Sequence, residues 1–322
     1  MRRAFELLAL LGDGAEHSGA ELSQALGVTR AAVWNQVQRL REAGIEIRGV
    51  AGQGYALAQG FEALDRAALR ERLDGAACVA WPAIEVARVT DSTNERLLRA
   101  LDSGDIHGHA LFAEFQTAGR GRRGDRWISP PGSGLCFSCG WRFDAPPSTF
   151  SALSLVVGLA VVRCLREAGA DDARLKWPND VVRNGRKLAG ILIEMRSEAG
   201  GPCHTVIGIG VNIALSPQAR AAIDQPSDDV TAACGHAVSR NALAASLLGR
   251  LGAMLAEFAT QGFAPFRDDW LAHDALVGRT VLLDLGPRTV SGRARGVDAH
   301  GALLIEHGGR CEPFVSGHLR AV

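Results

Sequence analysis

Residues 119–127 read GRGRRGDRW and place three glycines at the spacing G-x-G-x-x-G. In dinucleotide-binding folds this spacing follows a strand, and the third glycine opens a helix whose N-terminus holds a pyrophosphate. Here the glycines are followed by ISPPGSG, and two consecutive prolines prevent a helix from starting there. The stretch therefore excludes a doubly wound dinucleotide-binding fold and predicts a flexible loop with four arginines: Arg120, Arg122, Arg123 and Arg126.

Two interpretations of this basic loop remain open. One is a solvated turn without a ligand. The other is a clamp for an anionic group, because glycine lets the backbone approach a ligand and arginine pairs with carboxylate or phosphate through two parallel hydrogen bonds. Lysine is rare in this chain, since Lys176 and Lys187 are the two lysines among 35 lysines and arginines. A compact ammonium retained in an arginine-rich chain predicts that at least one of them is functional.

The stretch HSGAELSQALGVTRAAVWNQVQRLREAG predicts two helices around a short turn. The first helix covers about residues 19–26, Gly27 supplies the turn, and Thr29 is a suitable N-cap for the second helix. In the second helix three apolar residues at i, i+4 and i+7 share one face: Val33, Val37 and Leu40. This order is typical of a helix-turn-helix unit.

The opposite face of the second helix carries amides and arginines, which suit base edges and phosphates in a major groove. The following stretch, IEIRGVAGQGYALA, predicts a β-hairpin with glycines at its tip, the wing of a winged helix. A helical interaction module with a solvated face is the simpler alternative. The combination favours DNA binding by Thr29, Arg30, Ala31, Trp34, Asn35, Gln38 and Arg48.

The rest of the chain mixes strands and helices. Residues 61–73, FEALDRAALRERL, predict one connecting helix. Runs such as IEVARV, HALFAEFQTA and HTVIGIGVNIAL predict strands, and two long apolar helices are predicted over about 149–168 and 240–260, the second capped by Ser239. RLKWPNDVVRNGRKLAGILIE predicts a hairpin around an Asn-Gly turn. Five short strands near the C-terminus predict a small β-barrel. The predicted class is α+β, with units 1–60, 61–274 and 275–322.

Charge and cysteine content exclude several classes of function. The formal net charge is +0, so the overall charge does not point to a nucleic-acid or membrane partner. Seven cysteines in a chain of this length do not indicate a disulfide framework, and Cys136 and Cys139, in the apolar run LCFSCGW, are expected to be buried thiols and not metal or redox ligands. No segment reaches the roughly 18 uninterrupted apolar residues of a membrane span. We therefore expect a cytoplasmic protein without a membrane partner.

Five short motifs, in order along the chain, carry a resemblance to a known family. They are DSTNERLL at 91–98, AEFQTAGRGRRGDRW at 113–127, KWPND at 176–180, KLAGILIE at 187–194 and GIGVNI at 208–213. Together they resemble the biotin protein ligases. The helix-turn-helix and the wing QGYAL resemble the bifunctional members, which also repress the biotin operon. The resemblance covers nearly the whole chain and implies a winged helix-turn-helix, an α+β ligase domain and an SH3-like β-barrel.

The resemblance also implies a reaction. The carboxylate of biotin attacks the α-phosphate of ATP, with Mg²⁺, to give biotinoyl-5′-AMP. A lysine of the biotin carboxyl carrier protein of acetyl-CoA carboxylase then attacks this mixed anhydride. In the first step the carboxylate of biotin must approach the phosphates of ATP, and both are anions. The resemblance therefore implies that the arginine loop and Mg²⁺ screen this repulsion. Asp125 departs from the family, where we expect a basic residue, and it lowers the positive charge of the loop.

Matching the motifs residue by residue gives the implied sites. The implied catalytic residues are Lys187 and Arg122, and the implied metal ligand is Asp180. The implied biotin-binding residues are Ser92, Thr93, Asn94, Gln116, Gly119, Arg120, Gly121, Arg122, Lys187 and Gly190. The implied ATP-binding residues are Arg122, Arg123, Trp127, Lys176, Asn179, Asp180 and Asn212.

The implied partners are operator DNA, the carrier protein and a second copy of the chain, as a homodimer loaded with biotinoyl-5′-AMP. Three alternatives are weighed: a ligase without repressor activity, a non-catalytic biotin-sensing repressor, and a lipoate ligase, which shares the α+β fold. The complete recognition helix and wing argue against the first. Lys187 and the arginine loop argue against the second, and the glycine-rich arginine loop favours biotin over lipoate. Residues 214–235 are interpreted as a loop over the adenylate.

Overall fold

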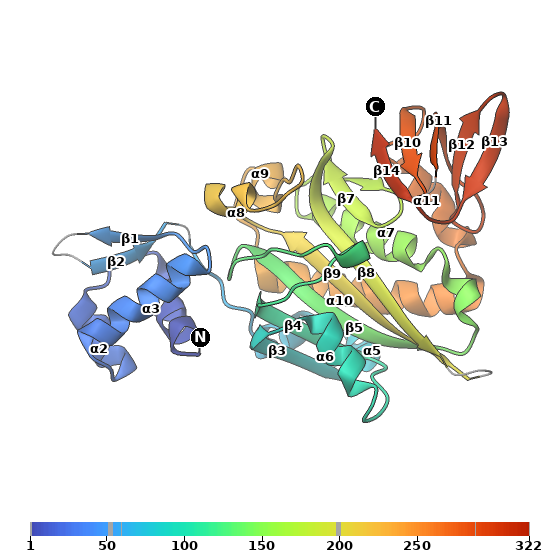
Figure 1. Cartoon of the computed structure of the whole chain (residues 1–322). Coiled ribbons are helices and arrows are strands. Elements are labelled where there is room, and N and C mark those ends of the chain that lie inside the picture. The colour runs from blue at the N-terminus through green and yellow to red at the C-terminus, as the bar shows by residue number, and fades with distance from the viewer. Residues whose placement is uncertain (1, 51–53, 59, 198–200, 287, 322) are drawn as a thin grey trace.

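The computed structural model describes residues 2–50, 54–58, 60–197, 201–286 and 288–321. Three units follow one another along the chain (Figure 1). A small helical unit with a two-stranded sheet comes first, a unit around a seven-stranded sheet comes second, and a five-stranded sheet comes last. The predicted α+β class is confirmed.

The first unit has the predicted helix-turn-helix and wing. Its elements are α1 (Arg2–Leu10), the 3-10 turn η1 (Leu11–Asp13), α2 (Gly19–Leu26), α3 (Arg30–Glu42), β1 (Ile47–Val50) and β2 (Gly54–Leu57). Gly27 ends α2 in the left-handed conformation, and the hydroxyl of Thr29 accepts a hydrogen bond from Ala32 N at 3.2 Å to cap α3. The predicted apolar face of α3 is fully buried against α1 and α2, through Val33, Val37 and Leu40. The predicted tip of the wing, at 51–53, lies outside the described residues.

The prediction of a single helical stretch in the connector, residues 61–80, is wrong, because the connector contains two short helices. They are α4 (Arg66–Arg72) and α5 (Gly75–Ala80). The carboxylate of Asp65 caps α4 and that of Asp74 caps α5, because each accepts a hydrogen bond from a backbone N–H of the first turn. The residues before Asp65 remain outside the helix because their backbone bonds elsewhere, as where Leu64 N donates to Glu114 Oε1 at 2.5 Å.

The central sheet has the strand order β3-β4-β5-β9-β8-β7-β6. Its strands are β3 (Ala83–Thr90), β4 (His109–Gln116), β5 (Gly134–Phe143), β6 (Arg174–Lys176), β7 (Asp180–Arg183), β8 (Arg186–Ser197) and β9 (Cys203–Asn212). The strands β3 and β4 are parallel and are joined through α6 (Thr93–Ala100), whereas all other neighbours are antiparallel. The predicted Asn184-Gly185 turn joins β7 to β8, with both residues at positive φ. This order brings the motifs of β4, β7, β8 and β9 to one side of the sheet.

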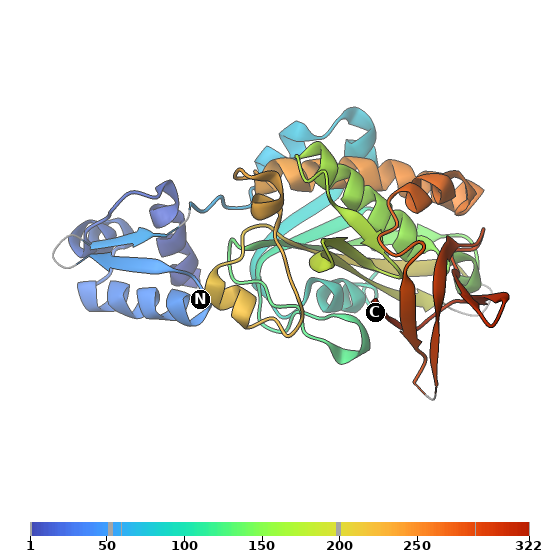
Figure 2. The ribbon, with the colours of Figure 1, turned by 90° about the horizontal axis from the view of Figure 1, so that it is seen from above.

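Helices cover both faces of this sheet (Figure 2). One face carries α4, α5 and two long helices, α7 (Leu153–Glu167) and α10 (Arg240–Gln261), which pack on each other, and the opposite face carries α6. The first long helix begins later than predicted because a 3-10 turn, η3 (Pro147–Phe150), precedes it. Ser239 caps α10 as predicted, since its hydroxyl accepts a hydrogen bond from Ala242 N at 3.1 Å.

Two helical spans, Pro147–Glu167 and Arg240–Gln261, are long and apolar enough to cross a membrane by length and composition alone. In this fold 72% and 56% of their most apolar windows are buried inside the protein. Residues such as Leu159 and Leu247, both 0% exposed, belong to the main hydrophobic core. The two helices therefore have the burial expected of core helices.

The chain passes through η4 (Ala264–Phe266) and α11 (Arg267–Ala272) into the last unit. Its five antiparallel strands, in the order β13-β12-β11-β10-β14, confirm the five predicted strands. They are β10 (Thr280–Asp284), β11 (Thr289–Val297), β12 (Leu303–His307), β13 (Arg310–Phe314) and β14 (His318–Ala321). This sheet packs on the central unit, because Trp177 Nε1 donates to Gly301 O at 3.1 Å and a Cβ at Gly301 would lie 2.6 Å from Ala152 Cβ.

The prediction of buried thiols on the apolar strand is confirmed. Cys136 and Cys139 lie on β5 and are 5% and 0% exposed. Burial raises the pKa of both thiols, which disfavours the thiolate that metal binding and redox chemistry require. Within the described ranges, no group of three His, Cys, Asp or Glu side chains is placed to hold a metal ion.

Candidate functional site

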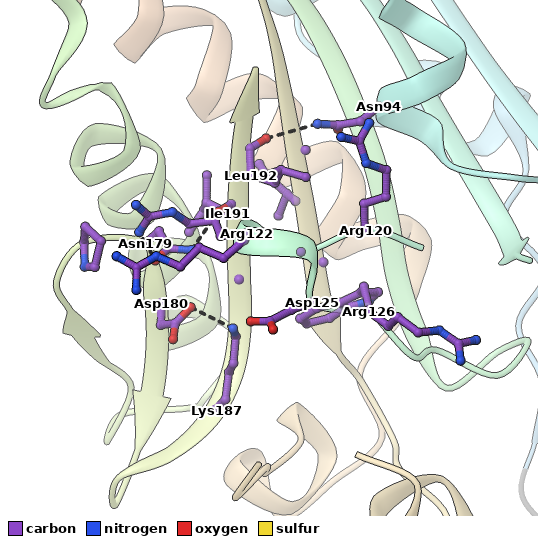
Figure 3. A pocket seen from close by; sticks show the side chains of 18 of the residues that line it. Asn94, Arg120, Arg122, Asp125, Arg126, Asn179, Asp180, Lys187, Ile191 and Leu192 are labelled. Atoms are coloured by element: carbon purple, nitrogen blue, oxygen red, sulfur yellow. Dashed lines mark hydrogen bonds and ion pairs between the residues drawn. The ribbon is translucent and has the colours of Figure 1, made fainter. Parts of the chain in front are cut away.

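A polar pocket lies where the arginine loop faces strands β6 to β9 of the central sheet (Figure 3). Most residues predicted from the motifs line it: Ser92, Thr93, Asn94, Gln116, Arg120, Gly121, Arg122, Arg123, Trp127, Lys176, Asn179, Asp180, Lys187 and Gly190. Two other predicted residues, Gly119 and Asn212, do not line it. The C-terminal unit also reaches the pocket, through Gly317, His318 and Leu319.

One end of the pocket is a network of buried hydroxyl and amide groups. Thr93, the first residue of α6, donates from its backbone N to Gln116 Oε1 at 2.8 Å. The hydroxyl of Ser138, on β5, lies 2.6 Å from Thr93 Oγ1 and 2.5 Å from Asn94 Oδ1. A Cβ at Gly208 would lie 2.2 Å from Asn94 Oδ1, so the amide needs a glycine opposite it. Since hydroxyls and amides both donate and accept, this end suits a small neutral polar group.

Glycines on β8 and β9 form a seat for Trp127, which comes from the arginine loop. Gly190 and Gly210 are paired across the two strands. A Cβ at Gly210 would lie 2.3 Å from Trp127 Cε2, and a Cβ at Gly190 would lie 3.3 Å from Trp127 Cζ3. The indole therefore lies against bare backbone, and Lys187 Nζ is 5.8 Å from the ring centroid. An aromatic face at this position can pack against a flat ring of a ligand.

The other end of the pocket has an excess of positive charge. Among the described residues that line the whole pocket, six are lysine or arginine and two are acidic, Asp125 and Asp180. Lys187 Nζ lies 2.8 Å from Asp180 Oδ1, an ion pair without the direction of a good hydrogen bond. Lys176 and Arg122 are partly buried, and this burial lowers the pKa of both side chains. Such partly desolvated cations suit a bound polyanion.

The arginines of the loop differ in how they are held, and Figure 3 shows Arg120 near Asn94 and Arg122 near Asn179. Arg120 is engaged by two carboxylates, with Nη1 2.7 Å from Glu95 Oε2 and Nη2 2.9 Å from Glu194 Oε1. Arg122 donates to the amide oxygen of Asn179 at 3.0 Å. The amide can release this arginine at lower cost than a pair of carboxylates can release Arg120. Arg122 is therefore the better placed of the two to bind an anionic ligand, whereas Arg120 fixes the loop to α6 and β8.

The backbone of the loop closes on itself. Trp127 N donates to Gly119 O at 3.0 Å, and Gly121 N donates to Asp125 O at 2.7 Å. A Cβ at Gly119 would lie 2.4 Å from Trp127 O, so Gly119 permits the close approach of the two chain segments. This close approach of the backbone is a sufficient reason for a glycine at position 119, and no direct contact with a ligand is needed to explain it.

Asn212 lies behind Lys187 and is 3% exposed. Its Nδ2 donates to Lys187 O and to Asp228 O, both at 3.1 Å. Lys187 N donates to Pro226 O at 2.9 Å, so the segment between β9 and α10 holds the backbone of the lysine from the other side. This segment includes α8 (Pro217–Ala221) and α9 (Val230–Cys234), and Gln225 from it lines the pocket.

Several residues that line the pocket or support its lining were not predicted from the sequence; Ser138 supports the lining, and Gly208, Gly210 and His318 line it. Ser138 is a hydroxyl inside an otherwise apolar strand, a signal that could have been read. Gly208 and Gly210 lie in a recognised motif, but the side chains that need them come from distant segments. His318 lies on β14, and its pKa is lowered mainly by burial and further by Arg320 and Lys176. No local pattern indicates that this residue reaches the pocket, because the contact depends on how the last two units pack.

The predicted DNA-contacting residues form an exposed surface on the first unit. Trp34 is 54% exposed, and Arg30, Ala31 and Asn35 are also exposed on α3. Gln38 is partly buried on the same helix, and Arg48 is exposed on β1 of the wing. Thr29 is exposed and serves as the N-cap of α3.

Comparisons with known proteins agree with this architecture. The model of the Biotin/lipoate A/B protein ligase family matches residues 86–212, an HTH domain model matches 3–56, and the Biotin protein ligase C terminal domain matches 276–318. The chain is 39% identical to the bifunctional ligase/repressor BirA of Escherichia coli (strain K12), over 98% of this chain and 95% of that protein. It is 31% identical to the bifunctional ligase/repressor BirA of Bacillus subtilis (strain 168), over 90% of this chain and 89% of that protein.

A solved structure, the biotin protein ligase from Aquifex aeolicus in complex with biotin and ATP, matches with a TM-score of 0.65 and 28% identity, over 75% of this chain and 100% of that chain. The fold and the pocket thus define the class, a protein ligase that carries a helix-turn-helix unit. The chain belongs to the Biotin/lipoate A/B protein ligase family, and within it to the bifunctional ligase/repressors, since the similarity runs through all three units.

Proposed function

We propose that this protein is an ATP-dependent biotin–protein ligase that also acts as a biotin-responsive transcriptional repressor. The observation that carries the proposal is a pocket with two unlike ends, a neutral polar end at Thr93 and Gln116 and a cationic end at Lys187. Biotin has a neutral ureido group at one end and a carboxylate at the other, so its two ends match. The bifunctional relatives and the helix-turn-helix unit support the second activity.

In the first step biotin lies with its ureido group among four side chains and with its carboxylate toward Lys187 and Arg122. The four are Ser92, Thr93, Asn94 and Gln116. A carboxylate oxygen forms a bond to the α-phosphorus of ATP, and the bond from that phosphorus to the bridging oxygen breaks. Pyrophosphate leaves with the electron pair, and biotinoyl-5′-AMP remains.

Positive charge is what this step requires from the protein. Two like unit charges about 4 Å apart repel by about 4 kcal/mol at an effective dielectric near 20. Lys187 lines the cationic end, and we infer that its ammonium contacts both anions as they approach. Arg122, Arg123 and Lys176 line the phosphate end and stabilise the charge that develops on the leaving group.

The remaining predicted residues have supporting positions. Trp127 presents its ring to the adenylate, and Asn179 holds Arg122 at the phosphate end. Asn212 acts through the backbone of Lys187, to which its amide donates, and Gly119, Gly121 and Gly190 let segments approach closely.

Asp180 fits the Mg²⁺ that accompanies ATP. Its carboxylate lines the phosphate end, and carboxylate oxygens together with substrate phosphates are the usual ligands of Mg²⁺ in such sites. Asp180 would hold the metal, which supplies positive charge to the phosphate oxygens. Asp125 brings a second carboxylate to the same pocket from the loop.

In the second step a lysine amine of an acceptor protein attacks the carbonyl carbon of the adenylate. The carbon–nitrogen bond forms, the carbon–oxygen bond to phosphate breaks, and AMP leaves. We assign the acceptor as the biotin carboxyl carrier protein of acetyl-CoA carboxylase. The folded arginine loop covers the anhydride until the acceptor arrives and so protects it from water.

Mass spectrometry of an acceptor protein tests the ligase. The purified protein is mixed with Mg·ATP, biotin and an apo carboxyl-carrier domain, and a parallel reaction contains lipoate in place of biotin. The carrier is expected to gain the mass of one biotinoyl group and nothing from lipoate. Lys187→Ala is expected to slow the reaction by roughly a hundredfold, the scale of a lost charged contact in a transition state. Arg186→Ala, the exposed neighbour on β8, is the matched control and keeps wild-type rates.

An unchanged carrier, under conditions where a known ligase modifies it, contradicts the enzymatic part of the proposal. A non-catalytic biotin-sensing repressor then explains the pocket better. Equal incorporation of lipoate contradicts the assignment of biotin.

The repressor activity follows from the first unit. We infer that α3 enters a major groove with Asn35 and Gln38 toward base edges, and that Arg48 and the wing contact the backbone. Two copies loaded with biotinoyl-5′-AMP pair and present two recognition helices to the two half-sites of an operator. Because DNA and the carrier protein are the proposed partners, we propose that the protein acts in the cytoplasm.

Selection from a pool of random duplex DNA tests this part. Biotin with ATP is expected to enrich one sequence with two related half-sites. Affinity for it falls with salt, and Arg30→Ala lowers the salt slope by about one unit, as for one lost phosphate contact. Enrichment that is the same without biotin and ATP leaves a ligase with an unregulated DNA-binding unit. No enrichment at all contradicts the repressor.

A further inference from the structure

A second cavity lies between the central unit and the C-terminal unit, and we call it the interdomain hollow. Lys176 lines both the pocket and this hollow, so the two cavities are neighbours. Among its described lining residues the charged ones are Arg174, Lys176, Arg279, Arg320, Asp172 and Asp274. They come from β6 and its approach, from the passage into β10, and from β14, so the hollow exists because the two units pack together.

Three of the four basic side chains described in the hollow have no partner, whereas Arg174 donates to the backbone oxygens of Asp171 and Ala173. Within the part of the chain that the structure describes, the side chains of Lys176, Arg279 and Arg320 form no ion pair or hydrogen bond. Burial is the main cause that lowers the pKa of Lys176, and the positive charges of Lys187 and Arg320 lower it further against the effect of Asp180. The positive charges of the two cavities thus repel one another, and Asp180 offsets this repulsion only in part, since it already pairs with Lys187.

The two carboxylates of the hollow do not neutralise this charge. Asp172 Oδ2 lies 3.8 Å from Arg183 Nε, a residue outside the hollow. Asp274 Oδ1 accepts a hydrogen bond from Leu276 N at 2.8 Å, and the carboxylate makes no ion pair with a described residue. An anionic ligand therefore meets an excess of free arginine and lysine donors in the hollow.

We propose that the interdomain hollow binds inorganic pyrophosphate as it leaves the pocket. The proposal rests on the proposed ligase function, whose first step releases pyrophosphate beside Lys176. Arginine pairs with phosphate oxygens through forked hydrogen bonds, and a polyanion relieves the repulsion within a group of cations. The cations of the pocket that stabilise the leaving group also slow its release. The cations of the hollow begin at Lys176, which both cavities share. Pyrophosphate can therefore pass from the pocket into the hollow without crossing the arginine loop. Product release limits the turnover of many enzymes.

Calorimetric titration of the full-length protein with inorganic pyrophosphate tests the proposal. The wild-type protein is expected to bind two equivalents, one in the pocket and one in the hollow. Arg279→Gln combined with Arg320→Gln, both at exposed positions, is expected to weaken one of the two by roughly tenfold or more, the scale of lost charged hydrogen bonds. Arg310→Gln removes the same kind of charge from an exposed site of the same unit outside the hollow and is the matched control.

Binding of one equivalent or none to the wild-type protein contradicts the proposal, as does identical binding to the wild-type and doubly substituted proteins. A double variant that loses both equivalents, or that also loses affinity for ATP, shows that the arginines belong to the nucleotide site and contradicts a separate site.

A second assay separates this inference from the proposed function. All three proteins are given ATP and biotin, and the release of pyrophosphate is followed. Release by all three, with a slower steady rate in the double variant, supports both statements. Absence of release from all three contradicts the ligase function, while the titration still reports whether the hollow binds pyrophosphate. Equal steady rates, with the second equivalent lost, contradict a role of the hollow in release.

Discussion

Trp127 lies inside the pocket because the two residues opposite its ring are glycines. A single methyl group at Gly210 would lie 2.3 Å from Trp127 Cε2, well within the contact distance of two carbon atoms. A residue can therefore be required in a binding site because it lacks a side chain, even where it makes no contact with the ligand.

Gly210→Ala is expected to displace the indole and to reduce the rate of adenylate formation roughly tenfold or more, because overpacking of this kind costs about 1–3 kcal/mol. The rate with saturating biotin and varied ATP measures the effect. Gly75→Ala, where a Cβ has no neighbour within 4 Å, is the control. Unchanged kinetics in Gly210→Ala would show that the ring has no part in binding.

Asp274 provides a test of pH dependence. Burial raises the pKa of its carboxyl group from 3.8 to about 6, although Arg174, Lys176, Arg279, Arg320 and Asp172 line the same hollow. Between these two pKa values the folded protein binds more protons at this group than the unfolded chain. This group therefore makes the free energy of unfolding fall as the pH rises through that window, by at most about 3 kcal/mol.

Asp274→Asn keeps an oxygen for the hydrogen bond from Leu276 N and removes the titration. The variant is expected to be more stable than the wild-type protein at pH 8, with the difference shrinking toward zero near pH 3. Urea unfolding at several pH values measures this difference. A gain that is the same at all pH values would contradict the assignment to ionisation.

At the scale of elements, two glycines of the helix α10 differ in how closely a neighbouring helix packs against them. Gly249 and Gly252 both lie in its interior, one turn apart. A Cβ at Gly249 would first meet Ala77 Cβ at 4.0 Å, whereas a Cβ at Gly252 would lie 2.9 Å from Ala80 Cβ. Gly249 lowers the helix propensity of α10 without being required by packing, whereas Gly252 allows α5 to pack closely against α10.

Gly249→Ala is expected to raise the free energy of unfolding by about 0.5–1 kcal/mol, because alanine has the higher helix propensity. Gly252→Ala is expected to lower it by about 1–3 kcal/mol through overpacking against α5. Thermal or urea unfolding of the pair provides the measurement. Stabilisation by both substitutions would show that α5 moves away at little cost.

The elements were largely predictable where a local signal was strong. Thr29 and Ser239 cap the helices that follow them, and the Asn184-Gly185 turn joins two strands, because these residue types act on backbone groups within a few positions. The connector was mispredicted because Asp65 and Asp74 are N-caps nine residues apart, and an apolar pattern alone does not show that a second helix begins at Asp74.

At the scale of the whole molecule, the contact between the last two units runs through Trp177. Its Nε1 donates to Gly301 O at 3.1 Å, and the side chain is 3% exposed. The adjacent residues Lys176 and Pro178 line the pocket. The C-terminal unit thus supports the strand that carries part of the phosphate end.

Trp177→Phe keeps a ring and removes the donor, which leaves Gly301 O without this partner. It is expected to lower the free energy of unfolding by about 1–3 kcal/mol, the cost of an unsatisfied buried group, and to raise the KM for ATP more than that for biotin. Trp34→Phe, at an exposed position of α3, is the control for both measurements. Equal changes in the two KM values would indicate a general loss of stability and not a support for the phosphate end.

The sequence by itself determined the local elements, the arginine loop and most residues of the pocket. The local elements and the loop depend on periodicity, capping and spacing, which act over a few residues, whereas the pocket residues were implied by the resemblance to the biotin protein ligases. Tertiary structure alone decided that Ser138 completes the polar end, that Gly208 and Gly210 make room for Asn94 and Trp127, and that His318 reaches the pocket. It also showed Asn212 behind Lys187 instead of in the lining. The physical reason is that each of these contacts joins segments far apart in the chain, and their meeting depends on how sheets and units pack.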